Sequence, residues 1–132
     1  MRSKKYLVIA AISMAIAIAF GALGAHALKK IFDLHALEAW RTAVFYQIVH
    51  SLAVMIVVVS QKVFNIEKVD IILNLMISGF IMFSTSIYLL SFNSIWEISW
   101  LGKFLGPLTP IGGLLMISSW IILSVKFYKI TK

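Results

Sequence analysis

The sequence predicts an all-α membrane protein, a four-transmembrane-helix antiparallel bundle with both chain ends inside. Two observations lead to this prediction. The chain has 132 residues, of which 61% are hydrophobic and 13% charged, and its mean hydropathy is +0.99, whereas a soluble domain is roughly half apolar and a quarter charged. The apolar residues also form four long runs. So much apolar surface on so small a protein requires lipid rather than water as its solvent.

Each apolar run has about the length of a membrane span. A helix needs roughly 20 apolar residues to cross a hydrocarbon core of about 30 Å. Barrel strands would be segments of about 10 residues with alternating polarity, and these runs are continuous. Because backbone groups in lipid must be paired within their own segment, each run is predicted to be helical. The predicted spans cover residues 6–28, 44–60, 71–92 and 108–127. The second helix is expected to begin before its apolar run, because Leu34, Leu37 and Trp40 recur at helical spacing and Asp33 is a suitable N-cap.

The first run begins like a signal peptide but is too long for one. Three basic residues lie within residues 2–5, and residues 25–27 have the small-x-small pattern of a cleavage site. The apolar part, residues 6–24, has 19 residues, whereas the apolar region of a signal peptide has about 7–15. We therefore expect an uncleaved first span.

No linker or clear repeat interrupts the chain, so one domain is expected over residues 1–132.

Basic residues are unevenly divided between the two sides of the predicted membrane. If the N-terminus is inside, eight lysines and arginines lie inside and four outside. Positive residues are enriched on the cytoplasmic side, so we expect both ends of the chain in the cytoplasm. The lack of a soluble domain and of a targeting extension favours a bacterial plasma membrane as the location. The inner residues are Arg2, Lys4, Lys5, Lys62, Lys68, Lys126, Lys129 and Lys132, and the outer ones are Lys29, Lys30, Arg41 and Lys103.

The net charge of +7 does not indicate nucleic-acid binding. Such binding requires a basic face on a folded surface, and here the basic residues form short clusters between the apolar runs. The chain has no cysteine, which excludes disulfides, thiol nucleophiles and cysteine metal sites.

Small residues indicate where the helices approach one another. Helices in lipid associate where small side chains let their backbones come close. The first span carries two series of small residues at intervals of four, which predicts neighbours on more than one side. The fourth span opens with a proline, suited to a first helical turn, and two glycines. The predicted helix-packing residues are Ala17, Gly21, Gly24, Ala25, Pro110, Gly112 and Gly113. The lipid bilayer is the expected partner, and a homo-oligomer or another membrane protein is also possible on this pattern.

Polar residues inside the apolar spans form the candidate site. Tyr46, Gln47, His50 and Ser51 share one helical face through spacings of three and four, and polar groups in a span usually face the bundle interior. One interpretation is an outward-opening polar pocket, in which His50 relays protons or binds a metal with a second histidine. The other is that these side chains hydrogen-bond across helices and fix their register, and we favour it. The candidate pocket residues are His26, Tyr46, Gln47, His50, Ser51 and Tyr88.

No motif in the sequence indicates catalysis. The H-x-x-x-H and H-E-x-x-H metal patterns and the G-x-S-x-G nucleophile pattern are missing from the sequence. All five acidic residues lie in connections or at helix ends, so no carboxylate within a span could orient His50. We therefore predict no catalytic residue, metal site or cofactor, and no enzyme.

Four short segments resemble a known family in the right order along nearly the whole chain. They are GALGAHAL at 21–28, YQIVHSLA at 46–53, the Phe-Ser and Ser-Ile-Tyr parts of 83–88, and TPIGG at 109–113. Together they resemble the YgdD/YwdK-like family of small four-helix membrane proteins, a domain of unknown function. The resemblance implies a multi-pass membrane protein, located in the plasma membrane in bacteria, and it implies no activity. The motif positions that it marks are His26, Tyr46, Gln47, His50, Tyr88, Pro110 and Gly112.

Three functions remain open at this stage. The first is an accessory membrane protein that contacts partner helices or lipids, favoured by the short loops and by the lack of a soluble domain or of an acid within the spans. The second is a small transporter or channel with a polar pocket around His50 in the outer half of the membrane. The third is a metal-binding membrane protein, with His26 and His50 as ligands.

Overall fold

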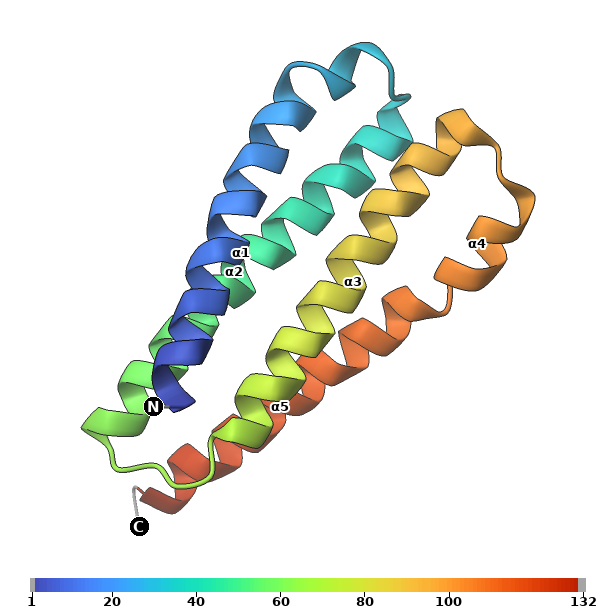
Figure 1. Ribbon diagram of the computed structural model, residues 1–132. Coiled ribbons are helices and arrows are strands. Elements are labelled where there is room, and N and C mark those ends of the chain that lie inside the picture. Colours follow the sequence, from blue (N-terminus) through green and yellow to red (C-terminus); the bar gives the residue numbers. More distant parts are fainter. Residues whose placement is uncertain (1, 131–132) are drawn as a thin grey trace.

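Four long helices run up and down the molecule in the computed structural model, which describes residues 2–130 (Figure 1). Each of the four is long and apolar enough to cross a membrane, and no strand occurs in residues 2–130. This confirms the predicted all-α fold with four helices able to span a membrane. The elements are α1 (Arg2–Ala25), the short 3₁₀ helix η1 (Leu28–Lys30), α2 (Leu34–Val63), α3 (Asp70–Trp96), α4 (Ser99–Leu105) and α5 (Leu108–Ile130).

The helices differ in length from the apolar runs that predicted them. The helix α2 begins at Leu34, ten residues before the predicted span, because Asp33 caps it by accepting a hydrogen bond from the Ala36 backbone N–H at 2.7 Å. Its 30 residues measure about 45 Å, more than a hydrocarbon core of about 30 Å requires. Conversely, α1 ends at Ala25, three residues before the end of the predicted span at residue 28. Hydropathy therefore located the part of each helix that suits lipid, while a capping side chain sets where α2 begins.

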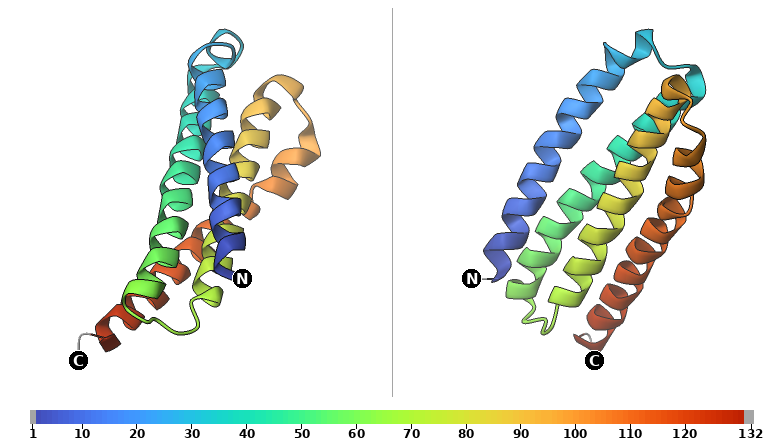
Figure 2. Two further views of the ribbon diagram at one scale, coloured as in Figure 1. Left: turned by 60° about the vertical axis from the view of Figure 1, so that its left-hand side comes forward. Right: turned by 45° about the vertical axis from the view of Figure 1, so that its right-hand side comes forward.

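The four long helices lie side by side in the order α1, α2, α3, α5 (Figure 2). The helix α3 packs along both α2 and α5, whereas α1 packs mainly along α2. The bundle is therefore open, with α1 and α5 at its two edges. The start of α1 and the end of α5 lie at the same end of the molecule (Figure 1), as an even number of spans requires. Lys132 and the side chain of Arg2, both counted in the predicted orientation, lie outside the described part.

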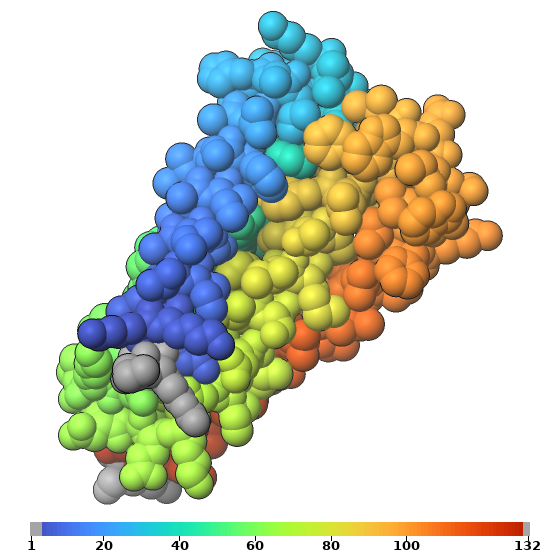
Figure 3. Space-filling model, viewed as in Figure 1, coloured from blue at the N-terminus to red at the C-terminus, as the bar shows by residue number. Residues whose placement is uncertain are grey.

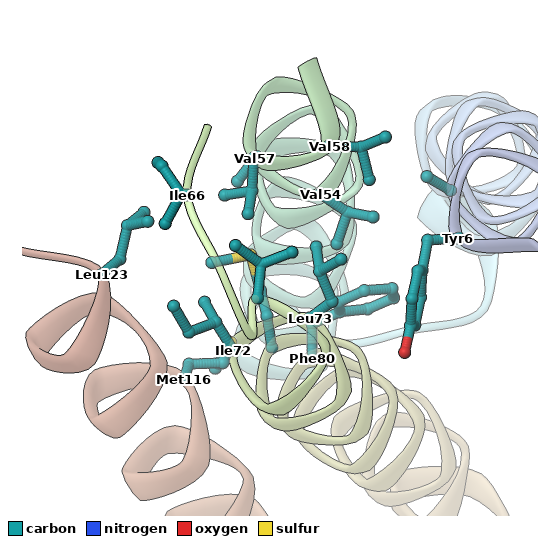
Figure 4. Packing of buried hydrophobic residues seen from close by; sticks show 14 residues of the cluster. Tyr6, Val54, Val57, Val58, Ile66, Ile72, Leu73, Phe80, Met116 and Leu123 are labelled. Carbon is teal, nitrogen blue, oxygen red and sulfur yellow. The ribbon is translucent and has the colours of Figure 1, made fainter. Parts of the chain in front are cut away.

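Apolar side chains from all four long helices meet near the end that holds the start of α1. Figure 4 shows Tyr6 of α1, Val54 of α2, Phe80 of α3 and Leu123 of α5 converging on this cluster. Phe80 and Val54 have no exposed surface. A second cluster, which combines aromatic rings with aliphatic side chains, fills the opposite end around Trp40. These two cores hold the helices together in a solvent where apolar burial contributes little, so close packing has to supply the attraction.

Two glycines set the contact between α3 and α5. A Cβ on Gly112 would lie 2.6 Å from the Phe83 backbone nitrogen and 2.7 Å from the Gly79 carbonyl oxygen. Gly79 on α3 meets the same contact, with the Gly112 carbonyl oxygen 2.9 Å from its own added Cβ. The two backbones thus approach so closely that no larger residue fits at either position.

The other expected packing residues are placed unequally. Ala17 is fully buried, and Gly24 lies against Trp40, whose Cδ1 would be 2.8 Å from an added Cβ. An added Cβ on Gly21 would make ordinary contact with Val44 at 3.5 Å. The remaining three do not lie in the close helix contacts: Ala25 and Pro110 are exposed, and an added Cβ on Gly113 would have nothing within 4 Å.

Candidate functional site

A hydrogen-bonded polar network joins α1, α2 and α3 inside the bundle, with Gln47 at its centre. The Gln47 side chain is only 8% exposed. Its Nε2 donates to the Ser13 carbonyl oxygen at 3.1 Å and lies 3.2 Å from Ser13 Oγ, while its Oε1 accepts from the Tyr88 hydroxyl at 2.8 Å. The Ser51 hydroxyl donates to Ser13 Oγ at 2.9 Å. Both ends of the Gln47 amide are therefore paired, which is the condition for placing it in lipid at low cost.

His50 lies one turn from this network but turns toward α5. Its Nε2 lies 3.3 Å from Trp120 Nε1, and its Nδ1 lies 2.9 Å from the Tyr46 carbonyl oxygen. An indole N–H only donates, so Nε2 must accept and Nδ1 must carry the proton that it donates to Tyr46. The contacts thus assign a neutral imidazole with both nitrogens engaged. The polar face expected on α2 is therefore divided: Gln47 is bonded to α1 and α3, and His50 contacts α5.

The remaining candidate residues lie at the edge of this arrangement. Tyr46 is 36% exposed, and its ring packs against Phe83 at a centroid distance of 4.6 Å. His26 is exposed just beyond the end of α1. Since Ser13 contacts α2 at the level of Gln47, His26 lies about 20 Å farther along α1 than this network. The structure therefore brings together Gln47, Ser51 and Tyr88, and it leaves His26 apart from them. Residues 2–130 contain no group of three side chains suited to hold a metal.

Other polar contacts between helices follow the same pattern. The Tyr6 hydroxyl donates to Asn74 Oδ1 at 3.1 Å, joining α1 to α3. The Ser84 hydroxyl donates to a backbone carbonyl of α2 at 2.9 Å, and Trp40 Nε1 donates to the Phe20 carbonyl oxygen at 2.8 Å. Sequence reasoning named neither Trp120 as the partner of His50 nor the pairing of Tyr6 with Asn74. Both pairings depend on which helices are neighbours, and one chain's sequence carries no signal of that.

A lateral groove with a volume of about 640 Å³ lies between α1 and α3. Figure 3 shows this face, with α1 and α3 as its walls and α2 visible between them. Isoleucines of α1 and apolar residues of α3 form the walls, while Gln47 and Tyr88 lie at the floor. We call this hollow the α1–α3 groove. A smaller hollow of about 340 Å³, the α2–α5 groove, opens between those two helices and is also apolar.

These features define an all-α, multi-pass membrane protein with four spans and polar contacts between its helices. Comparison with known proteins gives a more specific assignment. Residues 20–113 match the model of a protein family, DUF423, whose description is "protein of unknown function". The chain belongs to this family. No solved structure matches the chain.

The relatives cover nearly the whole chain and are named as membrane proteins. The UPF0382 membrane protein YwdK of Bacillus subtilis is 36% identical over 96% of this chain and 98% of its own length. A UPF0382 membrane protein of Haemophilus influenzae is 34% identical over 95% and 94%, and one of Schizosaccharomyces pombe is 38% identical over 85% and 92%. The expected family and the membrane location are thereby confirmed, and the bacterial relatives indicate the plasma membrane. None of these names states an activity.

Proposed function

We propose that this protein is an accessory membrane protein that acts through its lateral surfaces, by contact with lipid or with another membrane protein, and not as an enzyme, carrier or channel. One observation supports this most. The buried polar side chains at the centre of the bundle are hydrogen-bonded to one another or to backbone, while the α1–α3 groove and the α2–α5 groove open sideways and are lined mainly by apolar residues.

The alternative of transport fits the site less well. A transport path needs polar or ionisable groups along a route between the two sides of the membrane. Gln47 and Tyr88 are bonded to each other across α2 and α3, and the His50 nitrogens are both engaged. Moving an ion past these groups would break hydrogen bonds that have no replacement in lipid.

The proposed orientation places both chain ends in the cytoplasm. Both ends of the described chain lie at the same end of the molecule, and that end carries the larger share of lysines. Positive residues flanking spans are retained on the cytoplasmic side. A tag on either end of the chain and a membrane-impermeant labelling reagent test this orientation. Labelling of both tags only after the membrane is opened would support it.

Native mass spectrometry of protein extracted gently from its own membrane tests the accessory role. We expect wild-type protein to carry lipid or another membrane protein, and we expect proteoliposomes to show no ion or solute flux above that of empty vesicles. His50→Ala should lower thermal stability in detergent, because Trp120 then loses its acceptor. His35→Ala is the matched control, since His35 is exposed at the start of α2 and its loss should leave stability unchanged.

The opposite pattern would overturn the proposal. A tightly held non-lipid mass, or a flux, that disappears in His50→Ala while thermal stability is unchanged would show that the imidazole serves a ligand instead of a helix contact.

A further inference from the structure

The α1–α3 groove is closed at one end and open at the other. Near the end of the molecule that holds the start of α1, the hydrogen bond between Tyr6 and Asn74 joins the two walls. In the other direction the groove continues past Phe20 and Tyr88 to Trp96, the last residue of α3. An occupant that enters lengthwise therefore has one blind end in the membrane and one end near the headgroup level, where tryptophan is enriched.

The chemistry of the walls suits hydrocarbon. Ile9, Ile12 and Ile16 line the α1 wall, and Ile81 and Leu89 line the α3 wall. The polar side chains at the floor are occupied, since Gln47 is bonded to Ser13 and to Tyr88. The Ser84 hydroxyl is bonded to the Ala43 carbonyl oxygen, which leaves the exposed Thr85 as the polar side chain of the lining that can hold water. A mainly apolar hollow that opens to lipid is filled by lipid or by another apolar molecule.

The groove is small for a whole helix. The α1 wall from Ile9 to Phe20 is about 17 Å long, and a helix with its side chains is about 10–12 Å wide. A helical segment of that length occupies on the order of 1,300–1,900 Å³, more than the groove volume of about 640 Å³. A partner helix could insert only side chains, whereas a slender hydrocarbon chain can lie within the groove along its length.

Charge at the open end adds a recognition element for a headgroup. Leu28 of η1 packs into the aromatic cluster around Trp40, which also borders the groove. The next two residues, Lys29 and Lys30, are exposed, and neither forms an ion pair within the described chain. Three carboxylates lie at the same end of the molecule. Asp33 caps α2, Glu38 lies in the first turns of α2, and Glu97 directly follows α3. Lysine ammonium groups on flexible stems attract the phosphate of a lipid headgroup as point charges.

On these observations we propose that the α1–α3 groove binds one acyl chain of a phospholipid whose phosphate is held by Lys29 and Lys30. This inference rests on the proposed accessory function and specifies one occupant of one lateral surface. The acyl chain lies against the isoleucines of α1, with its methyl end toward the Tyr6–Asn74 contact.

Two tryptophan variants on one helix test the position of the chain. Ile16→Trp places a larger side chain in the groove, while Ile18→Trp makes the same change on a residue that is 61% exposed and lies outside the groove. Each protein is reconstituted in nanodiscs of phosphatidylglycerol and phosphatidylcholine, and the lipids retained after release into detergent are counted by native mass spectrometry. We expect one retained phospholipid in the wild type and in Ile18→Trp, and none in Ile16→Trp.

A second pair of variants tests the headgroup. Replacing both Lys29 and Lys30 with glutamine should weaken retention of phosphatidylglycerol by roughly fivefold for each lysine removed. The control replaces Lys62 and Lys68, at the other end of the molecule, and should leave retention unchanged. Equal retention by both variant pairs would overturn the assignment of the phosphate to η1.

Wild-type protein supplies a test that does not depend on variants folding. A phospholipid with a photoactivatable group in its acyl chain should label peptides containing Ile9 or Ile16 of α1 and Leu89 of α3. Labelling confined to the α2–α5 groove, or undiminished retention in Ile16→Trp, would contradict the inference while leaving the accessory role intact. A retained protein chain lost in Ile16→Trp would make the occupant a partner helix and would equally contradict it. Failure of the accessory role itself would instead appear as flux that depends on His50.

Discussion

Gly112→Ala is the substitution for which the structure gives the sharpest expectation. An alanine Cβ at this position would lie 2.6 Å from the Phe83 backbone nitrogen and 2.7 Å from the Gly79 carbonyl oxygen. Real Cβ atoms rarely come closer than 3.4 Å to such neighbours. Because the obstructing atoms belong to the α3 backbone and not to a flexible side chain, α3 and α5 have to separate by about 0.8 Å to admit the methyl group.

The cost follows from the packing that this separation loosens. A gap of about 0.5–1 Å removes a quarter to a half of the dispersion energy of each contact that it opens. Forced overpacking of this kind costs about 1–3 kcal/mol. Alanine in place of a helical glycine recovers about 0.5–1 kcal/mol through backbone entropy. The expected net effect of Gly112→Ala is a loss of up to about 2.5 kcal/mol in the free energy of unfolding.

The neighbouring glycine supplies the control. Gly113→Ala makes the same chemical change one residue away, where an added Cβ has nothing within 4 Å. Its stability should be unchanged or raised by up to about 1 kcal/mol. Unfolding of the two variants in mixed micelles, followed by circular dichroism as the fraction of denaturing detergent rises, measures the difference. Equal midpoints for Gly112→Ala and Gly113→Ala would refute the close approach of α3 and α5.

Two further variants test single contacts. Gly24→Ala should destabilise the protein by about 1–3 kcal/mol and shift its tryptophan fluorescence, because the new Cβ would lie 2.8 Å from the Trp40 ring. Gly21→Ala is the control, since its Cβ would lie at an ordinary 3.5 Å from Val44. It should change neither the melting temperature nor the emission. Trp120→Phe keeps an aromatic ring beside His50 but removes its N–H donor, so thermal unfolding should show a loss of about 0.5–1.5 kcal/mol, and an unchanged melting temperature would argue against that hydrogen bond.

The sequence was a good guide to the number of membrane-spanning helices and to the medium that surrounds them. Both depend on long-range averages, since the length of an apolar run and the balance of charge remain visible without knowing any contact. Helix ends were less predictable. The hydrogen bond to the Asp33 carboxylate confirms this residue as the expected N-cap of α2, whereas α1 ends within a stretch that is still apolar and carries no signal for a helix end.

The candidate site shows where sequence reasoning stops. Spacing correctly places Gln47, His50 and Ser51 on nearby turns of α2, but it cannot say that Gln47 turns to α1 while His50 turns to α5. That division depends on which helices flank α2, a property of the assembled fold. The small-residue pattern had a similar limit. Gly112 and Gly113 are equivalent in sequence, and only the positions of the α3 backbone atoms distinguish the one that is essential for packing.

The central claim of this account is that the polar side chains inside the bundle hold helices together. A double-mutant cycle on Gln47 and Tyr88 tests it most directly, because their side chains are bonded to each other at 2.8 Å across α2 and α3. The free energy of unfolding is measured for wild type, Gln47→Met, Tyr88→Phe and the double variant. We predict a coupling energy of about 0.6–1.7 kcal/mol, with each single variant less stable than wild type. A coupling of zero, with both single variants as stable as wild type, would contradict the claim and would leave these side chains available for a ligand.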